Sequence, residues 1–239
     1  MKKHIPNTIT CCNLICGCIA VVNAINGNLP AALLFIILGA VFDFFDGMSA
    51  RLLHVSSEIG KELDSLADDV TFGVAPASII FYELQVVSPD NQFGTLLPYL
   101  AWIVAAFSAI RLAKFNLDTR QSMGFIGLPT PANALFWGSL IVGFGPALEQ
   151  YSWFMPLIVI GIFLSSWILI AEVPMFALKF KHWGFKGNEI KYLFIAFSAI
   201  TLIATIAAGL TSGTMRLCYS GFSIIIVAYV LVSILTQKK

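Results

Sequence analysis

The chain has 239 residues, of which 58% are hydrophobic and only 11% are charged, and its mean hydropathy is +0.86. This composition excludes a soluble globular domain and a disordered chain, and it predicts an all-α integral membrane protein. The formal net charge of +1 favours no class of partner. The sequence carries neither a basic patch nor a phosphate-binding P-loop, so we expect no nucleic acid partner.

Eight apolar segments, separated by turn-forming residues, predict about eight transmembrane helices. They cover residues 8–26, 31–52, 62–87, 95–115, 132–148, 154–178, 191–210 and 217–236. The basic start of the chain is interrupted by Pro6, and no small-residue cleavage site follows it. We therefore expect the first apolar segment to remain as a membrane span rather than to be removed as a signal peptide.

The basic residues predict the orientation of these spans. If the N-terminus is cytoplasmic, every Lys and Arg except Arg216 falls on the cytoplasmic side, as the positive-inside rule requires. An even number of spans then places the C-terminus in the cytoplasm as well. We expect a multi-pass protein of the cytoplasmic membrane, with both termini inside.

Four of the five cysteines crowd the first apolar segment. Cys11, Cys12 and Cys16 could bind a soft metal ion, but no CxxC pair and no nearby histidine accompanies them. The favoured interpretation is that these thiols are small packing residues, and we expect no disulfide.

The acidic residues gather between the second and third segments, and their spacing predicts a metal site. Asp43 and Asp46 are three residues apart and Asp64 and Asp68 are four apart, so each pair shares one helix face. An aspartate near a helix centre in lipid costs about 2.5–3.5 kcal/mol, so such a group needs compensating charge. Two antiparallel helices could bring four carboxylates around one point, a set of hard oxygen ligands suited to two Mg²⁺ or Mn²⁺ ions. Structural ion pairs between helices are the alternative.

The same stretch resembles a known family. The pattern Asp43-x-x-Asp46-Gly47-x-x-Ala50-Arg51, eight residues, Gly60-x-x-x-Asp64-x-x-x-Asp68 matches every fixed position of the CDP-alcohol phosphotransferase signature. The resemblance implies a catalytic core of six helices over residues 1–180, with two additional helices over 190–239, in one membrane domain. It also suggests a homodimer.

The resemblance implies a role for each signature residue. Asp43 and Asp64 would bridge two divalent ions, Asp46 and Asp68 would complete their coordination, and Asp68 would also be the catalytic base. The residues expected to hold the CDP group of the donor are Gly47, Ala50, Arg51 and Gly60, together with Asn7 and Thr10 in a Pro-Asn-x-x-Thr motif. Capping of the first helix by Asn7 or Thr8 is the alternative for that motif.

A second region resembles the phosphatidylserine synthase branch of the family. It comprises residues 111–116, Arg-Leu-Ala-Lys-Phe-Asn, and residues 125–131, Phe-Ile-Gly-Leu-Pro-Thr-Pro, and it departs from the branch at Lys114 and Asn133. Cations beside a carboxylate site could bind a phosphate or an amino acid carboxylate, although snorkelling to the membrane surface would also explain them. The candidate acceptor-binding residues are Arg111, Lys114, Asn116 and Thr130.

Taken together, the resemblance implies transfer of a phosphatidyl group from CDP-diacylglycerol to L-serine, which yields phosphatidylserine and CMP. Two alternatives remain open. The same chemistry could use another acceptor, such as glycerol 3-phosphate or an inositol compound. A divalent-cation transporter would also carry intramembrane acids, but its polar residues should extend through the whole membrane depth.

Overall fold

The computed structural model describes residues 4–55, 57–118, 120, 125–176 and 184–236. The α-helices and strands in chain order are α1 (His4–Ile25), α2 (Leu29–Leu53), α3 (Glu58–Asp68), α4 (Ala75–Val87), α5 (Trp102–Leu117), β1 (Phe125–Ile126), α6 (Thr130–Leu148), α7 (Phe154–Ile170), β2 (Pro174–Met175), α8 (Glu189–Ser212) and α9 (Gly221–Thr236). Short helices precede three of them, namely η1 (Asp69–Val74), η2 (Leu97–Ala101) and η3 (Met215–Tyr219).

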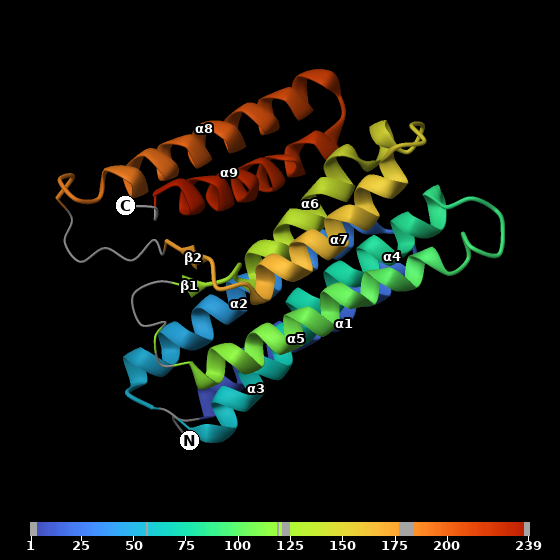
Figure 1. Cartoon of the computed structure of the whole chain (residues 1–239). Coiled ribbons are helices and arrows are strands. Elements are labelled where there is room, and N and C mark those ends of the chain that lie inside the picture. The colour runs from blue at the N-terminus through green and yellow to red at the C-terminus, as the bar shows by residue number, and fades with distance from the viewer. Residues whose placement is uncertain (1–3, 56, 119, 121–124, 177–183, 237–239) are drawn as a thin grey trace.

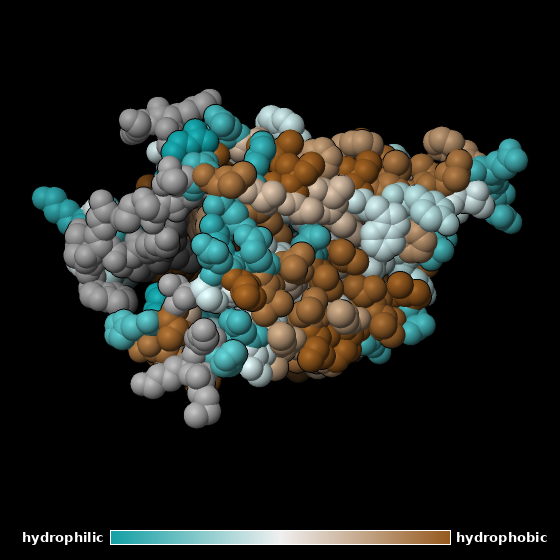
Figure 2. Space-filling model, turned by 90° about the horizontal axis from the view of Figure 1, so that it is seen from below, coloured by the Kyte–Doolittle hydropathy of each residue, from teal (hydrophilic) through white to brown (hydrophobic). Residues whose placement is uncertain are grey.

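The helical membrane architecture predicted from composition is confirmed. Within the described residues, six helical segments are long and apolar enough to cross a membrane, and α7 is a shorter apolar helix. Seen from below, the middle of the surface is mainly hydrophobic, and hydrophilic residues gather mainly toward the two ends (Figure 2). The cytoplasmic location of the termini stays a prediction.

The helices α1 to α7 run side by side in one bundle, and α8 and α9 form a hairpin along one side of it (Figure 1). The two short strands lie between the bundle and this hairpin. They pair antiparallel, with Phe125 opposite Met175 and Ile126 opposite Pro174. This pairing ties the loop after α5 to the segment after α7.

The prediction of a helix over residues 154–178 is wrong at its C-terminal end. The helix α7 ends at Ile170, and Pro174 and Met175 form β2. Pro174 has no N–H to donate to a helical carbonyl, and Glu172 places a charge just beyond the apolar run. Residues 177 and 178 of that prediction lie outside the described residues.

The third span is continuous from Glu58 to Val87 but is not α-helical throughout. Residues Asp69–Val74 form a π-helix between α3 and α4. In this turn Thr71 is fully buried, and its Oγ1 donates to the carbonyl oxygen of Asn13 on α1 at 3.1 Å. Single π-turns are often found at functional sites, because they shift the helix face by one residue.

The core lies where α1, α2, α4, α5, α6 and α7 meet. Phe72, Trp137 and Ile162 are among its fully buried side chains, and the Trp137 indole N–H donates to Ser165 Oγ at 3.0 Å. A second cluster joins the strands to the C-terminal hairpin through Leu128, Met175 and Tyr229. This second cluster also packs against Phe107 of α5 and Ala132 of α6.

Close packing of α1 against the π-helix depends on a glycine. A Cβ at Gly17 would lie 2.9 Å from the Cα and 3.0 Å from the backbone N of Thr71, so the two backbones would have to separate. At Gly47 on α2 a Cβ would meet nothing within 4 Å. The two glycines therefore have different structural roles.

We expect Gly17→Ala to destabilise the folded protein by about 1–3 kcal/mol through overpacking. The matched Gly47→Ala change should leave stability unchanged or raise it by about 0.5–1 kcal/mol, because Ala favours a helix more than Gly does. Thermal unfolding of the purified proteins in detergent measures both. Equal unfolding temperatures for the two variants would contradict this account of the packing.

Candidate active site

Three of the four predicted carboxylates lie together. Asp43 comes from α2, and Asp64 and Asp68 come from successive turns of α3, and one oxygen atom of each lies within 4.8 Å of the others. The hairpin between the helices makes this possible. The helix α2 ends at His54 in the left-handed conformation (φ 52°), and Ser57 caps α3 by accepting from the N–H of Gly60 at 3.0 Å.

The fourth predicted carboxylate, Asp46, binds a residue of α1. Asp46 Oδ2 accepts a hydrogen bond of 2.7 Å from Thr10 Oγ1 on α1, and Asp46 is buried. It borders the same cavity as Asp64. Asp46 therefore lies next to the group of three rather than within it, and its role as a metal ligand stays a prediction.

The group of three fits a divalent cation. Asp64 Oδ1 is buried and has no hydrogen-bond partner in the described part of the chain. No Lys or Arg of the described residues forms an ion pair with Asp43, Asp64 or Asp68. Carboxylate oxygens are the ligands that Mg²⁺ and Mn²⁺ prefer, and gathered carboxylates without a countercharge are costly in a membrane.

Asn13 holds one of the carboxylates in place. Its Nδ2 donates to Asp68 Oδ1 at 3.0 Å, while its backbone carbonyl accepts from Thr71. Asn13 is fully buried. Asn13 therefore links Asp68 to Thr71 of the π-helix that follows it. These two hydrogen bonds fix the orientation of the Asp68 carboxylate.

A cavity opens beside the carboxylates and contains most of the predicted donor-binding residues. Five of these six residues line it, namely Asn7, Thr10, Gly47, Ala50 and Gly60. The sixth, Arg51, is exposed and is not among the lining residues. Because a Cβ at Gly60 would lie 3.0 Å from Asn7 Oδ1, this glycine lets α1 and α3 approach each other at the cavity wall.

Two of the four predicted acceptor-binding residues share a second cavity. Arg111 is buried, donates from Nε to the carbonyl of Leu128 at 3.2 Å, and lies 4.9 Å from the ring centroid of Phe115. Lys114 Nζ donates to the carbonyl of Ile170 at 3.5 Å. Both line a cavity with Asp118, Arg120 and Glu172. Arg111 is also within electrostatic reach of Asp68, so this cavity is close to the carboxylates.

The other two acceptor candidates are not part of this cavity lining. Asn116 Nδ2 donates to Ser65 Oγ at 2.7 Å, and its carbonyl accepts from Lys61 Nζ at 2.9 Å. These bonds tie the end of α5 to α3. Thr130 is buried at the start of α6. Asn116 therefore holds together two elements that border the site.

Glu172 forms an ion pair with Arg120. Arg120 Nη2 lies 2.9 Å from Asp118 and 3.4 Å from Glu172. The hydrogen bond to Asp118 raises the pKa of Arg120, which stays a cation. The charge of Arg120 is therefore already compensated, in contrast to those of Arg111 and Lys114, which form no ion pair within the described residues.

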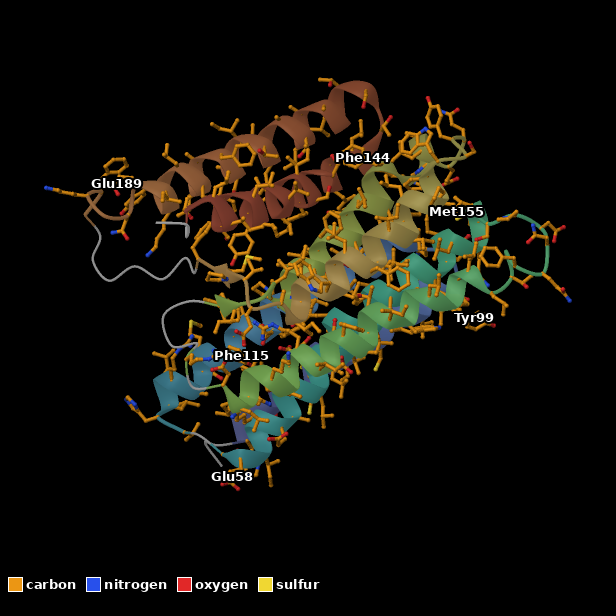
Figure 3. All side chains as sticks on the ribbon, viewed as in Figure 1. Glu58, Tyr99, Phe115, Phe144, Met155 and Glu189 are labelled. Atoms are coloured by element: carbon orange, nitrogen blue, oxygen red, sulfur yellow. The ribbon has the colours of Figure 1, made fainter. Side chains whose placement is uncertain are left out.

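Sequence reasoning missed several residues around the first cavity, among them Ser57 and Lys61. The capping position of Ser57 before an acidic helix start could have been recognised. Nothing local indicates that Lys61 reaches across to α5. In Figure 3, Glu58 and Phe115 lie at one end of the bundle, whereas Tyr99 and Met155 lie at the other. The candidate site is therefore confined to one end of the membrane span.

The chain is similar to several curated proteins named CDP-diacylglycerol–serine O-phosphatidyltransferase. The protein from Bacillus subtilis is 35% identical over 184 residues, which cover 75% of this chain and 91% of the relative. That from Mycobacterium leprae is 32% identical over 216 residues, or 85% of this chain and 67% of the relative. That from Methanocaldococcus jannaschii is 36% identical over 148 residues, or 62% and 63%.

The sequence model of one family, described as CDP-alcohol phosphatidyltransferase, matches residues 3–235 and thus nearly the whole chain. The matched residues include the carboxylate group, both cavities and the C-terminal hairpin. The chain therefore belongs to the CDP-alcohol phosphatidyltransferase family.

Proposed function

We propose that this protein transfers the phosphatidyl group of CDP-diacylglycerol to L-serine and releases CMP. The observation that carries the proposal is the group of Asp43, Asp64 and Asp68 beside a cavity at one end of the membrane span. The names of the relatives support serine as the acceptor.

Asp43, Asp64 and Asp68 are the residues that would hold Mg²⁺ or Mn²⁺, with Asp46 as a further ligand of a two-ion site. Bound divalent ions would supply positive charge where negative charge develops on the pyrophosphate oxygens during displacement. The unpartnered oxygen of Asp64 and the absence of ion pairs to these acids within the described residues support this assignment.

Asp68 is proposed as the general base. The serine hydroxyl oxygen forms a bond to the phosphorus that carries the diacylglycerol, the bond from that phosphorus to the CMP oxygen breaks, and the hydroxyl proton passes to Asp68. The hydrogen bond from Asn13 occupies Oδ1 and leaves Oδ2 for this proton. Asn13 would act as a positioning residue.

The donor would lie in the cavity between α1, α2 and α3. Gly47, Ala50 and Asn7 line this cavity, so the donor would meet two small residues and one side chain that carries an amide. Lys61 lines the same cavity and could meet a phosphate oxygen. This arrangement leaves Arg51 outside, so its proposed contact with the donor is the least supported of the set.

The acceptor would approach from the cavity of Arg111 and Lys114. Since neither forms an ion pair in the described residues, each can bind the carboxylate of serine. Glu172 and Asp118 at the same cavity can accept from an ammonium group. We further propose that the site faces the cytoplasm, where serine and CMP are soluble, and the homodimer stays a prediction.

CMP release by the purified protein tests the proposal. With CDP-diacylglycerol and Mg²⁺ or Mn²⁺, release should require serine and should not occur with glycerol 3-phosphate or an inositol compound. Asp68→Asn should lower the rate by about 10²–10⁴, because it removes the general base while keeping the hydrogen bond to Asn13 possible. Release with a different acceptor would refute the serine assignment, and full activity of Asp68→Asn would refute the role of Asp68.

The acceptor cavity gives a separate prediction. Lys114→Gln should raise the KM for serine about tenfold, because a hydrogen bond to a charged group is worth about 1.5–3 kcal/mol, while kcat should change little. The matched control is Lys186→Gln, which removes an exposed charge away from this cavity. Steady-state kinetics with varied serine measure the effect. An equal KM in both variants would remove Lys114 from the acceptor site.

A further inference from the structure

A third polar cavity lies at the end of the bundle remote from the carboxylates. Glu83 follows Asp68 by fifteen residues in the same continuous span, which corresponds to about 22 Å along a helix. Phe144, four residues before the end of α6, lies near the end opposite Glu58 (Figure 3). The polar residues of the cavity lining are Tyr82, Glu83, Glu149 and Arg216.

Glu83 is the central residue of this cavity. Its exposed fraction is 2%, and its Oε1 has no hydrogen-bond partner in the described part of the chain. A Cβ at Gly145 would lie 3.0 Å from that oxygen, so the glycine makes room for the carboxylate against α6. A buried carboxylate oxygen without a hydrogen-bond donor is costly, and a bound group that donates hydrogen bonds would remove that cost.

The helix α6 has one backbone carbonyl that lacks its usual helical hydrogen bond. Pro146 lies inside this helix and has no N–H, so the carbonyl of Val142, four residues earlier, loses its helical donor. Val142 and Pro146 both line the cavity, as does the carboxylate-bearing Glu149. The acceptors among the lining side chains are the carboxylates of Glu83 and Glu149, which match a ligand that carries N–H donors.

The charges around the cavity indicate where the parts of such a ligand would bind. Glu149 and Arg216 are within electrostatic reach of Glu83, but no ion pair joins Glu83 to Arg216 in the described residues. Arg216 is exposed and is the sole basic residue among those that line the cavity. An anionic group could therefore meet Arg216 while a cationic group reaches Glu83.

The size of the cavity favours a compact organic group over a bare ion as its ligand. Its volume is about 190 Å³, which is room for several water molecules. A bare metal ion would leave most of this space unfilled. The cavity lies at one end of the membrane spans, where lipid head groups are found.

We propose that this cavity binds the primary ammonium group of a small zwitterionic phosphate ester, with the ammonium at Glu83 and the phosphate toward Arg216. The ammonium group supplies N–H donors for the carboxylates of Glu83 and Glu149. The same chemistry is present in the head group of phosphatidylethanolamine and in free O-phosphoethanolamine. The site is separate from the carboxylate group, and its occupation requires no turnover.

Native mass spectrometry of the full chain in detergent, without donor or serine, tests this binding. Phosphatidylethanolamine should bind at least about tenfold more tightly than phosphatidylcholine with the same acyl chains, because a quaternary ammonium has no N–H donors. Glu83→Gln should abolish this preference. Asp90→Asn, which removes an exposed acid in the loop after α4 that does not line the cavity, should keep it.

A second variant tests the phosphate end of the cavity, and a soluble ligand tests whether the head group alone is sufficient. Arg216→Gln alters an exposed side chain and should weaken the binding of phosphatidylethanolamine without loss of folding. Displacement of the lipid by O-phosphoethanolamine would identify the head group alone as sufficient, and its failure with retained lipid preference would identify the membrane lipid as the ligand. Equal binding of the two lipids, or a preference that survives Glu83→Gln, would overturn the proposal. Neither result depends on whether the protein transfers phosphatidyl groups.

Discussion

The fold of this protein has to hold three carboxylates close together inside a membrane. Asp43, Asp64 and Asp68 have oxygens within 4.8 Å of one another, and no basic side chain of the described residues pairs with them. Like charges at this distance repel strongly where water is scarce. The surrounding fold fixes them nonetheless, through the tight turn after α2, the capped start of α3 and the hydrogen bond from Asn13. Divalent cations are the partners that would stabilise such a group.

The third span connects the functional regions of the molecule. Its first part, α3, contributes Asp64 to the cavity between α1, α2 and α3 and, through Ser65, binds the end of α5 near the cavity of Arg111 and Lys114. Its π-helix packs against α1 and is linked to Asp68 through Asn13. Its last part, α4, carries Glu83 at the remote cavity. One continuous span therefore carries residues of both ends of the protein.

Local spacing was sufficient to predict the carboxylate faces, because residues three or four apart share one side of a helix. The apolar segments likewise predicted most of the spans, since their length is set by the membrane. Contacts between segments that are far apart in the sequence could not be predicted from local spacing. No local pattern shows that Thr10 binds Asp46, that Arg51 is exposed, or that residues 125–126 pair with residues 174–175 and end the seventh segment early. Asn116 and Thr130 matched a motif, but motif membership does not distinguish a ligand contact from a contact that positions a helix.

Direct binding of Mn²⁺ tests whether the carboxylates form a site for divalent cations. Electron paramagnetic resonance of the detergent-solubilised protein counts bound Mn²⁺ without any substrate. We expect about two bound ions for each chain, the number used in two-metal sites. Asp64→Asn should lose this binding, whereas Asp90→Asn, an exposed acid outside the site, should retain it. Absence of bound Mn²⁺ in the unaltered protein, or equal binding by Asp64→Asn, would show that these carboxylates do not form a divalent-cation site.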